Sequence, residues 1–419
     1  MINYAVSASG YPVFHAQKAD SLICHAQITV NVGSAHEDPD SYGVAHFLEH
    51  LCFQGTPTKN KHQISREMDL LGNYNAGTGY FGTSYYFDAL CENFEPGFRV
   101  LKESVFDSNY PEYEFEKESR VIVEEWRMYD NYPSETFNNF TLDKCYGYQE
   151  GHPIIGTEDS IKAMTPEKLH RFRNRWYGRQ NMYILIVNNL SFENTLKIVD
   201  KYLPVSREVE VATDCLTSLK TTGIHSFETN RFDQAIYGIV QPWIGLIENF
   251  NSGYKPYFTL KALNKHLYEK IRDDLGLCYG VSTSKMTHYD RAYLFTTMLT
   301  SKDYLQKAQD ELFKEFDHVK TNGFPDELFR IAKNKAMFSQ LKGMQDIGGI
   351  SSVLNSLVSS TKDIDWILNT GKLTLDSNYL KQKADELKIE DLQDYAVKHL
   401  SSKENCVEFS MIPVKKNVS

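Results

Sequence analysis

Two histidines and a glutamate that could handle a metal ion lie close together in the run HFLEH at positions 46–50. Residues four apart share one face of a helix, so His46 and His50 can bind the same cation. Glu49 lies beside them and can take a proton from a water molecule at that cation. This H-x-x-E-H order is typical of hydrolytic zinc sites, whereas the alternative is a pair of ordinary packed histidines.

A catalytic zinc site needs three protein ligands and one open position, so a third ligand must come from elsewhere in the chain. The candidate is Glu125, which lies in a stretch without Gly or Pro, 113–128, that favours a helix. Glu118, seven residues earlier, falls on the same face of that helix and can orient a ligand from behind. The alternative is a solvated acidic face, which would also include Glu114, Glu116 and Glu124.

The elements that must position these residues mix strands and helices without strict alternation, which predicts the α+β class. Strand patterns, rich in β-branched or aromatic residues, occupy 21–32, 80–90 and 182–187. Helical patterns occupy 41–52, 95–108 and 113–128. The HFLEH run and Glu125 are therefore expected on two different helices.

The length of 419 residues exceeds what a single core usually serves, so two domains are expected. We place the first at 1–205, a polar and weakly periodic linker at 206–225, and the second at 226–419. The second half repeats the first, because a helix, a break with a proline and a long helix recur when Pro111 is aligned on Pro325, an offset of 214. Such a repeat indicates a tandem duplication.

The overall composition disfavours several classes of protein. A formal net charge of −10 argues against a general nucleic-acid binder. No apolar run approaches the roughly 20 residues of a membrane span, and no secretory signal pattern opens the chain, which favours a cytoplasmic protein. Seven scattered cysteines without a CxxC pair indicate neither a disulfide framework nor a cysteine zinc site.

Taken together, the motifs resemble those of the pitrilysin/insulinase (M16) family of zinc metallopeptidases, in the short single-half form similar to mitochondrial processing peptidase subunits. The resemblance rests on HFLEH and on the 74 residues that lie between His50 and Glu125. Further matches are FQGT (53–56), Asn75-Ala76, the Glu118/Glu125 pair, HPIIGTEDSI (152–161), and Arg272 with Tyr279 in IRDDLGLCY. Phe81 departs from the polar strand common in the family, which leaves the substrate preference open.

The resemblance implies one Zn²⁺ per chain, bound by His46, His50 and Glu125. Glu49 would be the general base, and Glu118 would support the site.

For the fold, the resemblance implies two tandem homologous α+β domains that form half of a clamshell chamber. Only the first domain would hold zinc, because Ala332 and Ser339 stand at the positions 214 beyond Glu118 and Glu125.

The resemblance also assigns substrate contacts. Arg272 and Tyr279 would hold the substrate near the zinc, where negative charge develops on the attacked carbonyl. Asn75 and Ala76 would lie on an edge strand that pairs with an extended peptide.

The activity expected from the resemblance is that of a zinc-dependent endopeptidase, which hydrolyses peptides or leader and unfolded segments in an enclosed chamber. The alternative is a non-catalytic family member that serves as a structural or peptide-binding subunit of a larger complex. The expected partners are a peptide substrate and a second identical chain, or a paralogue in a heterodimer, but no nucleic acid and no membrane span.

Overall fold

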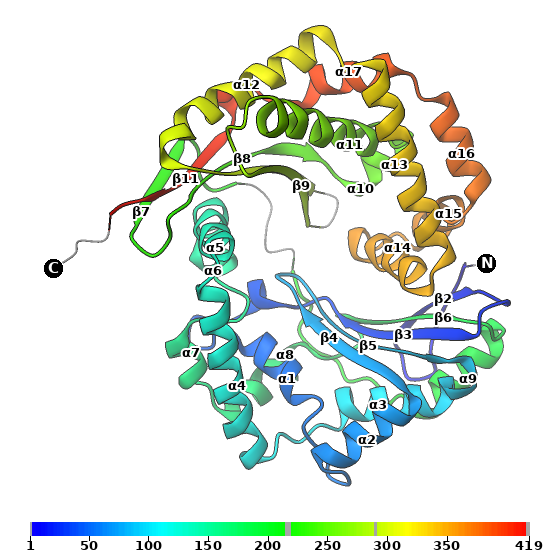
Figure 1. Ribbon diagram of the computed structural model, residues 1–419. Coiled ribbons are helices and arrows are strands. Elements are labelled where there is room, and N and C mark those ends of the chain that lie inside the picture. The colour runs from blue at the N-terminus through cyan, green and yellow to red at the C-terminus, as the bar shows by residue number, and fades with distance from the viewer. Residues whose placement is uncertain (1, 214–218, 289–290, 416–419) are drawn as a thin grey trace.

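The computed structural model describes residues 2–213, 219–288 and 291–415, and it contains two separate β-sheets (Figure 1). The strands of the first sheet are β1 (Ile2–Val6), β2 (Pro12–Gln17), β3 (Ile23–Val30), β4 (Gly72–Thr78), β5 (Thr83–Leu90) and β6 (Met182–Asn188). Their order is β1-β2-β6-β3-β5-β4, so β4 is an edge strand, antiparallel to β5.

The helices of the first half cover this sheet and extend away from it. They are α1 (Val44–Leu51), α2 (Lys61–Leu71), α3 (Phe94–Phe106), α4 (Glu112–Asp130), α5 (Pro133–Tyr146), α6 (Tyr148–Gly151), α7 (Glu158–Lys162), α8 (Pro166–Trp176) and α9 (Phe192–Tyr202). The central core of this half packs α1, α3 and α8 against the sheet, with Phe47, Phe98 and Leu169 fully buried.

The second sheet is formed by β7 (Ile224–Thr229), β8 (Ala235–Ile244), β9 (Gly280–His288), β10 (Arg291–Thr300) and β11 (Val407–Pro413), in the order β7-β11-β8-β10-β9. Its helices are α10 (Leu246–Asn251), α11 (Lys255–Leu267), a π-helical segment (Tyr268–Asp274), α12 (Leu305–Asn322), α13 (Asp326–Gln345), α14 (Ile347–Ser360), α15 (Ile364–Thr374), α16 (Ser377–Glu386) and α17 (Ile389–His399). The α+β class is confirmed.

The two sheets share one topology, as a tandem duplication requires. Strands β2, β6, β3, β5 and β4 correspond in order to β7, β11, β8, β10 and β9, and in each sheet the first two of these strands are parallel. The expected offset of 214 places the start of α4 on that of α13 and the start of α5 on that of α14. The two tandem homologous domains are therefore confirmed.

The strand β7 begins at Ile224, so the second sheet starts inside the stretch 206–225 where a linker is expected. The described residues of that stretch before β7, 206–213 and 219–223, form no helix or strand. The exact bounds of the two domains stay a prediction. Within the described ranges, no helix is long and apolar enough to cross a lipid bilayer.

The two domains interlock through one helix each. From the first domain, α5 stacks Phe137 on Phe295 and packs Phe140 edge-on against Phe409 of the second sheet. From the second domain, α14 contributes Leu354 to the buried cluster that contains Leu185 of the first sheet, and Figure 1 shows α14 lying over that sheet. Because each sheet needs the other domain's helix to cover one face, the two domains are held in a fixed relation.

Candidate metal centre and active site

The short helix α1 carries the HFLEH residues, and its apolar side anchors it in the first domain. Val44, Phe47, Leu48 and Leu51 are all fully buried. The polar side chains therefore lie on the opposite side, where the His46 and His50 side chains are 13% and 21% exposed. Two imidazoles one turn apart are thus held at the edge of a cleft on a rigid element.

Glu125 of α4 meets the two imidazoles. Its Oε2 lies 3.8 Å from His46 Nε2 and 3.4 Å from His50 Nε2. One ligand atom from each of the three residues lies within 4.8 Å of the others. They are the one group of His, Cys, Asp or Glu side chains in the described ranges arranged to hold a metal ion. Two imidazole nitrogens and one carboxylate form the ligand set of many catalytic zinc sites.

Glu118, two turns earlier on α4, supports His50 from behind. Its Oε2 lies 3.3 Å from His50 Nδ1, so it can accept a hydrogen bond from that nitrogen while Nε2 faces Glu125. Lys61 of α2 donates to the other oxygen of Glu118 at 3.0 Å. Burial favours the protonated form of Glu118, but these two partners outweigh burial and lower its pKa. This carboxylate–histidine contact fixes the orientation of a metal-binding imidazole.

The protonation of the two histidines differs. Burial, together with the charge of His50, lowers the pKa of His46 to about 4. Burial also acts to lower the pKa of His50, but its hydrogen bonds to Glu118 and Glu125 outweigh burial and raise the pKa to about 9. Near neutral pH, His46 is therefore ready to bind a cation, whereas His50 must release a proton as a metal binds.

Glu49 does not join the three clustered ligand atoms but lies beside them. It accepts a hydrogen bond of 2.6 Å from the hydroxyl of Thr78, at the end of β4. Burial raises the pKa of the Glu49 carboxyl, and the hydrogen bond from Thr78 opposes the increase. A carboxylate held next to a metal centre with a raised pKa suits a group that accepts and returns a proton.

Two cavities flank the cluster along β4. One, of about 530 Å³, adjoins His46 and is lined by Tyr129 and Ile154 of the first domain and by Phe295 of the second. The other, of about 540 Å³, adjoins Glu49 and His50 and is lined by residues 72–76. The expected edge-strand residues Asn75 and Ala76 therefore lie beside the cluster, and Asn75 is exposed.

Arg272 and Tyr279 lie elsewhere. Arg272, in the π-helical segment, pairs with Asp273 and lies over the ring of Tyr268. Tyr279, just before β9, has 80% of its surface exposed. Neither residue is among those that line the two cavities beside the cluster. Within one chain, the structure does not bring this pair to the candidate metal centre.

Lys61 and Thr78 are site residues that sequence patterns did not reveal. Lys61 belongs neither to the HFLEH motif nor to the Glu118/Glu125 pair. Thr78 lies in a strand far along the chain from Glu49. Their contacts arise only when α2 and β4 fold against α1 and α4.

Family profiles match both halves of the chain. The profile described as "Insulinase (Peptidase family M16)" matches residues 13–158, and the profile described as "Peptidase M16 inactive domain" matches residues 163–336. The chain belongs to the M16 peptidase family. The first match contains HFLEH, Glu118 and Glu125, and the second contains Arg272 and Tyr279.

Relatives of this M16 chain are named as zinc proteases. An "Uncharacterized zinc protease" of Rickettsia bellii is 26% identical over 353 residues, which cover 82% of this chain and 85% of that protein. The "Uncharacterized zinc protease YmxG" of Bacillus subtilis is 25% identical over 363 residues, with the same two shares.

Solved structures share the fold of this M16 chain. A protease from Helicobacter pylori aligns over 99% of this chain and 100% of its own, with a TM-score of 0.83 and 18% identity. The periplasmic protease PqqL from Escherichia coli aligns over 100% of this chain but 48% of its own, with a TM-score of 0.76 and 18% identity. The fold of this chain thus corresponds to about half of that longer protein.

Proposed function

We propose that this M16 family member is a zinc-dependent endopeptidase that hydrolyses peptides or short unfolded segments, including leader segments. The observation that carries the proposal is the convergence of His46, His50 and Glu125, with Glu49 beside them at the end of an edge strand. A non-catalytic subunit would not need this proton-accepting group next to the ligand set.

The donor set fits Zn²⁺. His46, His50 and Glu125 would hold the ion, and Glu118 would keep the imidazole of His50 in place through Nδ1. Bound zinc with three protein ligands keeps a fourth position open, acidifies water and polarises a carbonyl group. The same proposal assigns one zinc ion to each chain.

Glu49 supplies the proton transfer in this proposal. Its carboxylate accepts a proton from the water that attacks the scissile carbonyl, and it then delivers that proton to the leaving nitrogen. The hydroxyl of Thr78 donates a hydrogen bond to one oxygen of this carboxylate. Because that contact fixes the carboxylate group, it also fixes the orientation of the other oxygen.

The edge strand β4 offers a binding surface for the peptide. An edge strand presents N–H and C=O groups on its free side that an extended chain can bond, and Asn75 and Ala76 of this strand lie beside Glu49 and His50. Recognition through main-chain groups would make the sequence specificity loose.

We further propose that the active protein is a dimer, with Arg272 and Tyr279 serving the zinc centre of the other chain. The exposure of Tyr279 and the place of both residues outside the cavities beside the cluster support the proposal. A homodimer is favoured over a heterodimer with a paralogue, because this chain carries both the ligand set and the Arg/Tyr pair.

Removal of the metal tests the proposed function. Dialysis against a chelator should abolish hydrolysis of a quenched fluorogenic peptide, and one equivalent of Zn²⁺ per chain should restore it, whereas Mg²⁺ should not. Zinc-loaded protein that cleaves none of a diverse set of unstructured peptides would favour the non-catalytic alternative.

A further inference from the structure

Glu37 and His152 form a buried pair next to the start of α1. Glu37 is 1% exposed and His152 is 0% exposed. Glu37 Oε2 lies 2.8 Å from His152 Nε2, and His152 Nδ1 lies 3.2 Å from the carbonyl oxygen of Tyr148. Burying a carboxyl group and an imidazole is costly unless both are well paired. We therefore expect this pair to have a specific role at this position in the fold.

Glu37 caps the N-terminus of α1, whose own N-cap residue cannot do so. The first N–H groups of a helix have no partner within the helix, and Gly43 at the N-cap position has no side chain to bond them. The carboxylate of Glu37 accepts from Gly43 N at 2.6 Å and from Ala45 N at 2.8 Å. A carboxylate also suits the positive end of the helix dipole. The direction in which α1 starts is thereby fixed by a side chain outside the helix.

His152 connects this cap to the wall of the cleft. Its ring lies 4.0 Å from the ring of Tyr42, which immediately precedes Gly43. Gly43 has a φ of 90°, and a Cβ atom there would lie 2.5 Å from the carbonyl oxygen of Ile155. Ile155 in turn lines the cavity beside His46. The loop 152–156 and the start of α1 are therefore locked together.

We propose that Glu37 and His152 are a positioning pair for the zinc ligands. The helix α1 has only eight residues, and His46 lies one residue beyond Ala45, whose N–H is bonded to Glu37. A shift of the start of α1 moves both imidazoles relative to Glu125 on α4. The inference rests on the proposed zinc site, and it goes beyond it because it assigns a role to two residues that do not touch the metal. A purely structural pair would affect stability alone.

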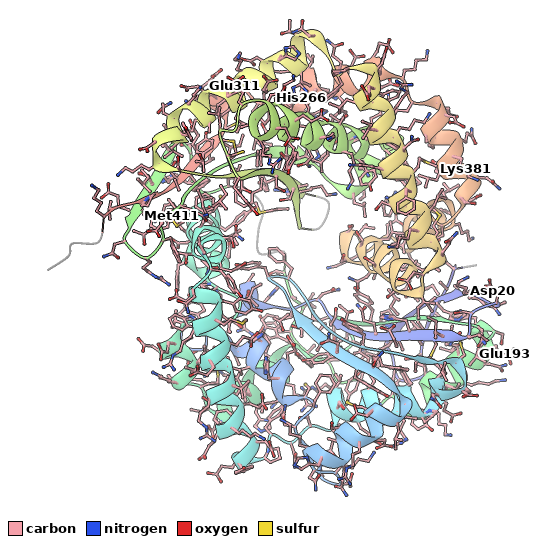
Figure 2. All side chains as sticks on the ribbon, in the orientation of Figure 1. Asp20, Glu193, His266, Glu311, Lys381 and Met411 are labelled. Carbon is pink, nitrogen blue, oxygen red and sulfur yellow. The ribbon has the colours of Figure 1, made fainter. Side chains whose placement is uncertain are left out.

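The second domain offers a matched control. His266 and Glu315 form another buried pair, with His266 Nε2 2.7 Å from Glu315 Oε2. Figure 2 labels His266 in the second domain, whereas Figure 1 shows α1 in the first domain. His266→Gln should therefore lower the unfolding temperature without changing the metal centre.

The test measures metal geometry separately from activity. Glu37→Gln, His152→Gln and His266→Gln are loaded with Co²⁺ for visible absorption, and their Zn²⁺ affinity is measured by chelator competition well below the unfolding temperature. We expect Glu37→Gln and His152→Gln to bind Zn²⁺ about tenfold more weakly and to show an altered Co²⁺ spectrum, by analogy with other groups that orient ligands. His266→Gln should retain the wild-type affinity and spectrum.

Wild-type affinity and spectrum in the folded Glu37→Gln protein would overturn the inference. If Glu37→Gln does not fold, His152→Gln decides in the same way, because it removes the contacts of His152 with Glu37 and Tyr42 that hold the cap against the loop, while the bonds from Glu37 to α1 still support folding. A wild-type protein that binds no zinc would instead contradict the proposed function, and the inference with it.

Discussion

At the scale of single residues, three members of the candidate site have partners that explain their positions. His50 is held between Glu118 and Glu125, Glu118 is held by Lys61, and Glu49 is held by Thr78. Because these partners come from three different elements, α4, α2 and β4, the ligand geometry depends on the packing of the whole first domain around α1.

Glu125 should be essential for metal binding. Glu125→Gln removes the negative charge and one of three ligands, so zinc content by elemental analysis should fall from about one per chain to a small fraction. Glu124→Gln is the matched control, because the neighbouring Glu124 side chain is 71% exposed and pairs with Arg127. Full zinc occupancy in Glu125→Gln would remove Glu125 from the site.

The sequence could predict His46, His50, Glu118 and Glu125 because each pair shares a helix, where spacing alone sets the face. That the helix of His46 and His50 packs against the helix of Glu118 and Glu125 could be inferred only from the family resemblance. Thr78 could not be predicted, since its contact with Glu49 depends on how closely the end of β4 approaches α1.

At the scale of elements, the duplicated sheets show which parts of the fold are general and which serve the site. Both sheets insert a late strand, β6 or β11, between two earlier ones, yet among the described residues only the first domain carries a clustered set of His and Glu side chains that could hold a metal ion. The proline-to-proline alignment predicted this repeat of helices, while the insertion of β6 and β11 is a long-range pairing that no local pattern specifies.

The joint between β2 and β6 should make stability depend on pH. His15 on β2 is buried, its Nε2 lies 2.9 Å from Asn188 Oδ1 on β6, and burial lowers its pKa. The unfolded chain therefore takes up the proton first, near pH 6.5, so stability is complete above that pH and decreases as the pH falls below it.

Urea unfolding between pH 8 and pH 5 checks this dependence. His15→Gln should show a flatter decrease in stability below about pH 6.5 than the wild type, because the titrating imidazole is gone. His62→Gln, at an exposed position of α2, should leave the wild-type profile unchanged. Identical profiles for His15→Gln and the wild type would show that His15 does not contribute.

At the scale of the whole molecule, the two interlocked domains form one unit in which the candidate metal centre and the Arg272/Tyr279 pair lie at separate places. The helices α5 and α14 tie each domain to the other's sheet, and the chain corresponds to about half of a longer relative in fold. In the proposed dimer, the exposed Tyr279 and Arg272 of one chain would contact the substrate at the zinc centre of the other chain.

Mixing two inactive variants tests the dimer. Glu49→Gln and Tyr279→Phe should each be inactive, but after subunit exchange one site of each mixed dimer joins an intact zinc centre to an intact tyrosine. About one quarter of wild-type activity should return after equal and random exchange. Fully active monomers by light scattering, or no rescue despite demonstrated exchange, would show that the site is completed in another way.

The most direct test of the central claim is the hydrolysis of a fluorogenic peptide by Glu49→Gln, with its zinc content measured on the same sample. We expect zinc to remain at about one per chain while turnover falls by roughly 10²–10⁴-fold, because the ligands are intact and proton transfer is lost. Turnover near the wild-type level in the zinc-loaded Glu49→Gln protein would contradict the proposed mechanism.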